Sequence, residues 1–278
     1  KYDYISFAKA LDSKDGVLGI SIVRLGVDNI LNTTQMIDSE GNIDYDKISK
    51  FSTSDYAGII SYAFRPGGNQ KLSVGINAKI VYRNIGKFAN GFGFGFDVGA
   101  IYRADSGYQF GAMLRDATTT VNFWSINQKE LSAVVNGEEF NPAPKDKMEI
   151  TMPKLNLGVS KNFEINRDLE LLPEAGLNVD FAKTAAVIST DFASISPYLG
   201  AELSFQKMIF VRAGLNRFQT VTDIEDLKRK VSMQPSAGIG IKYKGLTLDY
   251  AITNTGIGGS NYFSNFFSLK LDMRDFRY

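Results

Sequence analysis

The chain has 278 residues and a formal net charge of +1, from 31 Lys and Arg against 30 Asp and Glu. This balance is too even for a protein that binds nucleic acid through a basic surface. The sequence contains neither Cys nor His. Their absence excludes disulfide bonds, zinc sites built on these residues, thiol nucleophiles and every catalytic triad that uses imidazole.

Apolar and polar residues alternate along most of the chain, which is the period of a β-strand with one polar face. Between 72 and 83 the apolar set is Leu72, Val74, Ile76, Ala78, Ile80 and Tyr82. Between 92 and 103 it is Phe92, Phe94, Phe96, Val98, Ala100 and Tyr102. We predict thirteen strands, at about 2–11, 15–27, 53–65, 71–83, 92–104, 107–115, 151–163, 168–181, 193–205, 207–216, 233–243, 245–252 and 262–273.

The lengths of these strands and of their connections point to a membrane barrel. Many strands have 10–13 residues, whereas globular strands have about 5–6 and a tilted membrane strand needs about 9–11. Short and long connections alternate, and the longest are 28–52 and 116–150. Bacterial outer-membrane barrels have this pattern, with short periplasmic turns and long extracellular loops. We therefore predict an all-β fold, a transmembrane antiparallel up-and-down β-barrel over residues 1–278 in the bacterial outer membrane.

The barrel prediction has two further parts. Single-chain bacterial barrels have even strand numbers, so we expect fourteen strands in the full-length protein, with one N-terminal strand missing from this sequence. The apolar face should contact outer-membrane lipid and be exposed in the isolated chain. Six residues test this point: Phe94, Phe96, Leu177, Ile239, Leu269 and Leu271.

The opposite face of the strands is predicted to be polar and to line the lumen. Its charged residues, such as Lys79 and Asp97, carry both signs, so we expect them to pair with one another. Glycines such as Gly93 and Gly95 on this face leave room for something packed against the wall, or permit curvature. Four prolines fall inside predicted strands and indicate bulges or strand ends: Pro153, Pro173, Pro197 and Pro235.

Residues 1–115 resemble the PorV/PorQ family of Bacteroidota. The resemblance rests on RLGVDNILNTT from Arg24, on the acidic loop IDSEGNIDYDKISKF, and on the strands STSDYAGIISYAF and LSVGINAKIVYRNIGKFANGFGFGFDVGAIYR. It implies a FadL-like barrel of fourteen strands with an N-terminal hatch segment, which we expect to be missing here. It also implies a role in type IX secretion. In FadL-like barrels, kinks in the wall serve as lateral exits, which is a second interpretation of the prolines.

The acidic loop is a candidate cation site. Asp38, Glu40, Asn42 and Asp44 place oxygen ligands at alternate positions, a spacing that suits Ca²⁺ because one short loop must supply several oxygens. The loop departs from an EF-hand, because Gly41 comes early and no Glu follows at the twelfth position. The alternative is a solvated acidic loop without a metal, and no other cofactor is expected.

The loop 116–150 is the candidate partner-binding element. It carries Trp124, Phe123 and Phe140, and exposed apolar groups on an extracellular loop contact another protein or pack on the barrel rim. The leading functional hypothesis is a non-enzymatic barrel of type IX secretion that binds secreted cargo or translocon components through its loops. The alternative is a FadL-type channel for hydrophobic small molecules. An outer-membrane enzyme is disfavoured, because the usual Ser-His and Asp-His sites need imidazole.

Overall fold

The computed structural model describes residues 1–11, 16–38, 40–135, 138–140, 144, 147–222, 228–256 and 262–273, with the backbone alone at 133–135 and 138–140. The chain forms two compact units, Lys1–Val98 with Arg115–Pro153, and Gly99–Leu114 with Lys154–Tyr278. No helix in the described part of the chain has the length and apolar character needed to span a membrane.

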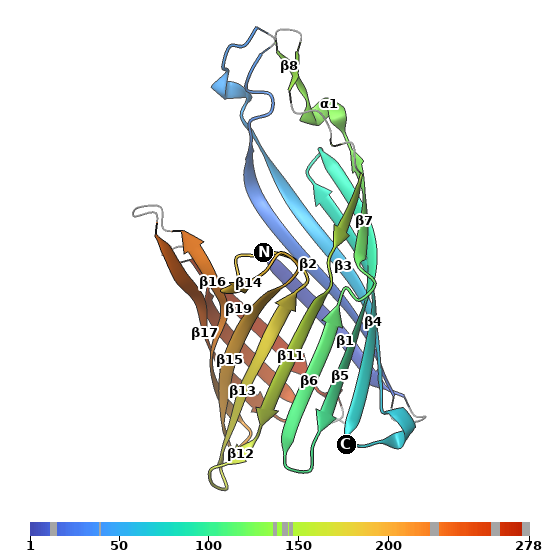
Figure 1. Cartoon of the computed structure of the whole chain (residues 1–278), viewed down its shortest axis with the longest axis vertical. Helices are drawn as coiled ribbons and strands as arrows, with labels where there is room; N and C mark the ends of the chain where they lie inside the picture. Colours follow the sequence, from blue (N-terminus) through green and yellow to red (C-terminus); the bar gives the residue numbers. More distant parts are fainter. Residues whose placement is uncertain are drawn as a thin grey trace. The chain divides into compact units, whose positions relative to one another are not determined.

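The first unit is built on antiparallel strands, drawn from blue to green in Figure 1. β1 (Tyr2–Ala10), β2 (Val17–Asn32), β3 (Ser49–Phe64) and β4 (Leu72–Ile85) pair in chain order. β5 (Ala89–Arg103), whose last residues belong to the second unit, pairs with β7 (Thr120–Ile126), and β7 pairs with β10 (Met148–Thr151). Short elements complete this unit: η1 (Tyr45–Lys47), η2 (Pro66–Gly68), α1 (Gln128–Leu131), and β8 (Ala133–Val135) paired with β9 (Glu138–Phe140).

The second unit is a second run of antiparallel strands, yellow to red in Figure 1 apart from the green β6. β11 (Lys154–Lys161) and β12 (Phe163–Glu164) pair with β13 (Leu169–Asp180), which pairs with β15 (Ser194–Phe205). The ladder continues through β16 (Ile209–Thr222), β17 (Arg229–Tyr243), β18 (Leu246–Asn254) and β19 (Phe263–Leu271). β6 (Tyr108–Arg115) and the two-residue β14 (Ile188–Ser189) complete the unit.

All thirteen predicted strands are present, with shifted ends. The largest shift is at the end of β16, which extends to Thr222. β2 and β3 pair as far as Asn32 and Ser49, so the predicted loop 28–52 is shorter than expected. The predicted loop 116–150 contains β7 and β10, and is therefore partly sheet. There, Val121 and Phe123 alternate with Asn122 and Trp124. This period of two is typical of a strand, although the sequence prediction gives the whole connection as a loop.

The apolar face of the strands is exposed, as predicted. Only Phe88 and Ala186 are buried apolar residues in the described part of the chain. The six test residues are exposed by 41% or more of their surface, and the prediction is confirmed: Phe94 48%, Phe96 42%, Leu177 41%, Ile239 48%, Leu269 66% and Leu271 55%. A soluble sandwich would bury these side chains between its sheets, so this arrangement needs an apolar surrounding.

The prolines inside strands lie where a ladder is interrupted on one side, because proline has no N–H to donate. Pro173 lies opposite the break between β11 and β12. Pro197 pairs with β13, whereas the direct pairing of β15 with β16 begins two residues later at Leu199. Pro235 pairs with β16 one residue before the β17–β18 ladder begins. Pro153 lies between β10 and β11, at the end of a strand. The interpretation of the prolines as strand ends and ladder breaks therefore agrees with the structure.

Candidate functional site

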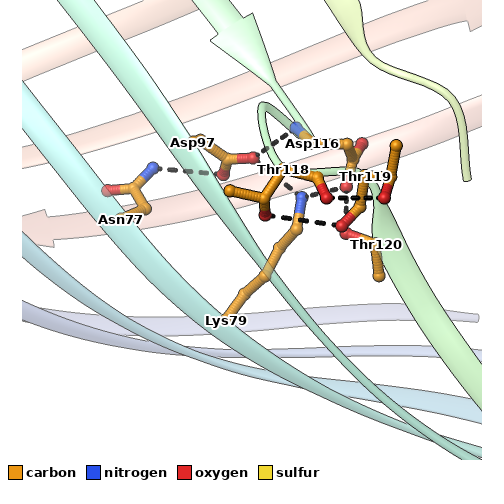
Figure 2. A network of polar contacts seen from close by, with 7 residues as sticks. All are labelled: Asn77, Lys79, Asp97, Asp116, Thr118, Thr119 and Thr120. Carbon is orange, nitrogen blue, oxygen red and sulfur yellow. Dashed lines mark hydrogen bonds and ion pairs between the residues drawn. The ribbon is translucent and has the colours of Figure 1, made fainter.

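A buried cluster of charges lies on the polar face of the first unit (Figure 2). The Lys79 ammonium on β4 is 2.8 Å from the Asp97 carboxylate on β5 and 2.5 Å from the Asp116 carboxylate. These side chains expose only 12%, 7% and 10% of their surface. One cation thus holds two carboxylates, and the amide of Asn77 donates a further hydrogen bond to Asp97.

The cluster fixes the chain where β6 ends and β7 begins. Asp116 and Thr119 have positive φ angles of 51° and 58°, a region that costs most non-glycine residues free energy. The backbone N–H of Asp116 donates to Asp97 at 2.9 Å, and the Thr120 hydroxyl donates to the Asp116 carboxylate. The strained turn is therefore held by charge-assisted hydrogen bonds, which are stronger than neutral ones. Figure 2 shows the Asp97 and Asp116 carboxylates beside the Lys79 ammonium.

Glycines of β5 make room for the side chains of β7. A Cβ added at Gly95 would overlap the Thr120 hydroxyl, and one added at Gly93 would overlap the Asn122 amide. Thr120 and Asn122 are buried as a result, at 4% and 3% exposed. The sequence predicted that something would pack against these glycines, and the structure shows that β7 supplies it.

The candidate partner-binding aromatics lie on opposite faces of β7. Trp124 is half-buried on the polar face, where its indole N–H donates to Glu149 at 2.9 Å and Arg83 lies 5.1 Å from its ring centre. Phe123 pairs with Phe92 on the apolar face and is 51% exposed. Phe140 lies in β9, and its side chain is outside the described part of the structure. Their role in binding a partner stays a prediction.

In the acidic loop, the two best-placed carboxylates bind the loop itself. Asp38 accepts backbone hydrogen bonds from Glu40 and Asn42, both at 2.9 Å, and one from the Asn42 amide at 3.0 Å. The Asn42 amide lowers the pKa of the Asp38 carboxyl by stabilising its charged form. Asp44 accepts from the backbone N–H of Asp46 at the start of η1. Among the described residues, no three acidic side chains gather as metal ligands, and calcium binding stays a prediction.

Two ion pairs share Arg212 on the polar face of the second unit. Its guanidinium is 2.6 Å from Glu202 on β15 and 2.6 Å from Asp249 on β18. Lys154 similarly pairs with Asp180 across the β11–β13 ladder at 2.9 Å. Like the Lys79 cluster, these pairs confirm that charges of the polar face neutralise one another.

The ladder between β15 and β16 is split and filled by a short insert, Ala185–Ser189. Direct pairing of the two strands ends at Leu199 and Leu215. Beyond that point, Ile188 and Ser189 of the insert pair with β15, and Ala186 forms a bridge to Gln219 of β16. Two backbone hydrogen bonds, of 2.8 and 3.2 Å, flank this bridge.

The insert is held further by Ser194, and it exposes apolar residues. Ser194 is fully buried, and its hydroxyl accepts from the Thr184 N–H, donates to the Ala182 carbonyl and contacts the Ser189 hydroxyl at 2.8 Å. Val187 and Ile188 are 44% and 56% exposed. A segment held by so few ladder bonds opens at a lower free-energy cost than a continuous ladder. We expect the insert to open more readily than the continuous part of the β15–β16 ladder.

Solved structures share this architecture. The Pseudomonas putida toluene transporter TodX matches with a TM-score of 0.54 and 12% identity, over 90% of this chain and 76% of that one. The Ralstonia pickettii toluene transporter TbuX matches with a TM-score of 0.51 and 13% identity, over 90% and 75%. The fold is that of a FadL-like transmembrane β-barrel. No family model and no curated protein matches the sequence.

The comparison supports the FadL-like part of the sequence resemblance and gives no support to its narrower part, PorV/PorQ of Bacteroidota. The two named structures are those of toluene transporters. In the charged clusters described above, ion pairs and hydrogen bonds hold the β6–β7 turn and the side chains of the polar face in place.

Proposed function

We propose that the protein is a non-enzymatic outer-membrane channel for small hydrophobic molecules of about the size of toluene. The observation that supports this most is the fold shared with toluene transporters over 90% of the chain. The exposed apolar face agrees with a place in lipid, because these side chains have no core to enter. The paired charges on the other face agree with a lumen that holds polar side chains without attracting ions of one sign.

The insert Ala185–Ser189 is the proposed side exit of this channel. A hydrophobic molecule that enters the barrel gains free energy by leaving into lipid rather than into water. The wall is split at the insert, and the insert presents Val187 and Ile188 on its surface. Opening there breaks few ladder hydrogen bonds, whereas opening elsewhere in the wall breaks a continuous ladder.

Cells that express this chain are expected to take up labelled toluene faster than cells with an empty vector. The measurement is uptake by intact cells of a porin-deficient outer-membrane strain, because diffusion through other porins is then small. Arabinose of similar size is the matched solute, and its uptake should stay unchanged, since a polar sugar has no preference for a lipid exit. Equal uptake of toluene with and without the chain would contradict the channel, and a parallel rise for arabinose would indicate a leak.

A second candidate is a type IX secretion barrel that binds cargo or translocon proteins, and the extended β2–β3 ribbon favours it. The loop beyond this ribbon exposes three apolar side chains, Ile37 at 42%, Ile43 at 55% and Tyr45 at 70%. Exposed apolar groups beside acidic ones suit a protein contact. In a secreting host, replacing Ile43 and Tyr45 with Ser should abolish co-purification of such partners. Unchanged co-purification from a normally inserted barrel would reject this loop as the contact.

A further inference from the structure

A cavity of about 360 Å³ lies on the polar face of the second unit, beside the short turns. Seven strand residues and two residues of connections supply its lining. The lining residues are Gln109, Asn162, Glu170, Leu172, Glu202, Ser204, Lys207, Phe210 and Lys242. Its volume is in the range of small-molecule sites, which are about 300–1,000 Å³.

Two large apolar side chains form the floor of this cavity, on a face that is otherwise polar. Leu172 lies opposite Glu202, and Phe210 lies between Ser204 and Gly240 in the ladder. Across the ladder from Phe210, Gly240 has the Asp249 carboxylate and the Arg212 guanidinium packed over it, and the Arg212 guanidinium lies 5.3 Å from the Phe210 ring centre. Leu172 and Phe210 are half-buried, and an apolar ligand that covers the surface they still show to the cavity gains free energy by leaving water.

Some polar groups around these two apolar side chains have ion-pair or hydrogen-bond partners among the described residues, and others do not. Glu170 is held by Lys207 at 3.0 Å and by Asn162 at 2.9 Å, and Glu202 is held by Arg212 at 2.6 Å. Lys242, by contrast, has no ion-pair partner in the described part of the chain. Ser204 is 6% exposed, and its hydroxyl oxygen has no hydrogen-bond partner among the described residues. The described part of the cavity lining therefore combines a cation without an ion-pair partner, Lys242, with the apolar side chains of Leu172 and Phe210.

We propose that this cavity binds a small aromatic carboxylate, with its ring on Phe210 and Leu172 and its carboxylate at Lys242. Both carboxylates of the lining are already paired, so they repel an anion less than free ones would. Aromatic rings prefer offset or edge contacts with one another, and Phe210 lines the cavity, so a ligand ring held there can make such a contact. The proposal rests on the proposed channel function, because it places a ligand site inside the same barrel.

The test is calorimetric titration of the full chain in detergent with benzoate, phenol and toluene. Benzoate should bind more tightly than phenol, and phenol more tightly than toluene. Lys242→Met should weaken benzoate binding by about tenfold or more, because the charge partner is lost. The matched control is Lys270→Met. Lys270 is on β19, on the same face of the sheet as Lys242 but outside the cavity, so this variant should bind benzoate as the unchanged chain does. Phe210→Ala should weaken all three ligands.

Two results would overturn the site: no benzoate binding by the unchanged chain, or equal binding by the Lys242→Met variant. Toluene uptake by cells, measured on the same variants, separates this outcome from failure of the channel. Benzoate binding without toluene uptake would support the site and reject the channel. Toluene uptake without benzoate binding would reject the site and leave the channel standing.

Discussion

Replacing Lys79 with Met is expected to destabilise the folded barrel by about 3–5 kcal/mol, because it leaves two buried carboxylates without their cation. Asp97 and Asp116 expose only 7% and 10% of their side chains, so water cannot replace the ammonium. The β6–β7 turn loses its clamp at the same time. The measurement is urea unfolding in lipid vesicles, followed by the fluorescence of Trp124, the single tryptophan, together with gel mobility.

The matched control is Lys183→Met, which removes another lysine from an ion pair. Lys183 and Asp191 are 2.7 Å apart but expose 69% and 92% of their side chains. Exposed pairs contribute about 0–1 kcal/mol, so this variant should unfold almost as the unchanged chain does. Adding Asp97→Asn to Lys79→Met should recover part of the loss, since the two sites are coupled. A Lys79→Met barrel as stable as the control would reject the clamp.

A disulfide across the insert is expected to reduce toluene uptake by about tenfold or more, with the barrel intact. Ala186→Cys with Gln219→Cys joins the insert to β16 at a bridge whose hydrogen bonds lie on either side of the pair. Such non-hydrogen-bonded pairs bring side chains close, with Cα atoms about 4.5 Å apart, which suits a disulfide. The chain contains no native Cys, so no other thiol competes.

Uptake is measured with and without a reductant, which should restore it. The control pair, Ala201→Cys with Ala213→Cys, joins β15 to β16 where the ladder between these two strands is continuous. It should leave uptake unchanged, because that part of the wall does not open. If the oxidised insert pair transports toluene normally, the insert is not the exit, although the channel itself would stand.

The sequence was sufficient to predict the strands, the face on which each side chain lies, and the pairing of opposite charges on the polar face, because a period of two is a local property. The exposure of Phe94 and Leu269 and the ion pairs of Arg212 followed from alternation alone. The resemblance to PorV/PorQ placed the chain among FadL-like barrels, but it did not separate secretion from transport. That distinction depends on what the interior and the wall can bind or release.

The parts that the sequence did not predict depend on contacts between distant residues. Asp116 joins the Lys79 cluster only because the turn after β6 bends back toward β5, and its strained φ angle leaves no periodic signal. The bridge between Ala186 and Gln219 connects a loop to a strand 33 positions later. The nearest sequence signals were the alternation of Val121 to Trp124 within the long connection and Pro197 inside its strand.

The scarcity of buried apolar residues has a consequence for how the protein reaches its folded state. With Phe88 and Ala186 as the only buried apolar residues in the described part of the chain, burial in water contributes little to folding. The free energy instead comes from transfer of the apolar face into lipid, so folding and insertion form a single step. Before that step the chain is unfolded and its apolar residues are exposed to water. It is therefore prone to aggregate, and it depends on chaperones until it reaches a membrane. Variants that weaken the barrel should therefore appear in cells first as lower amounts of inserted protein.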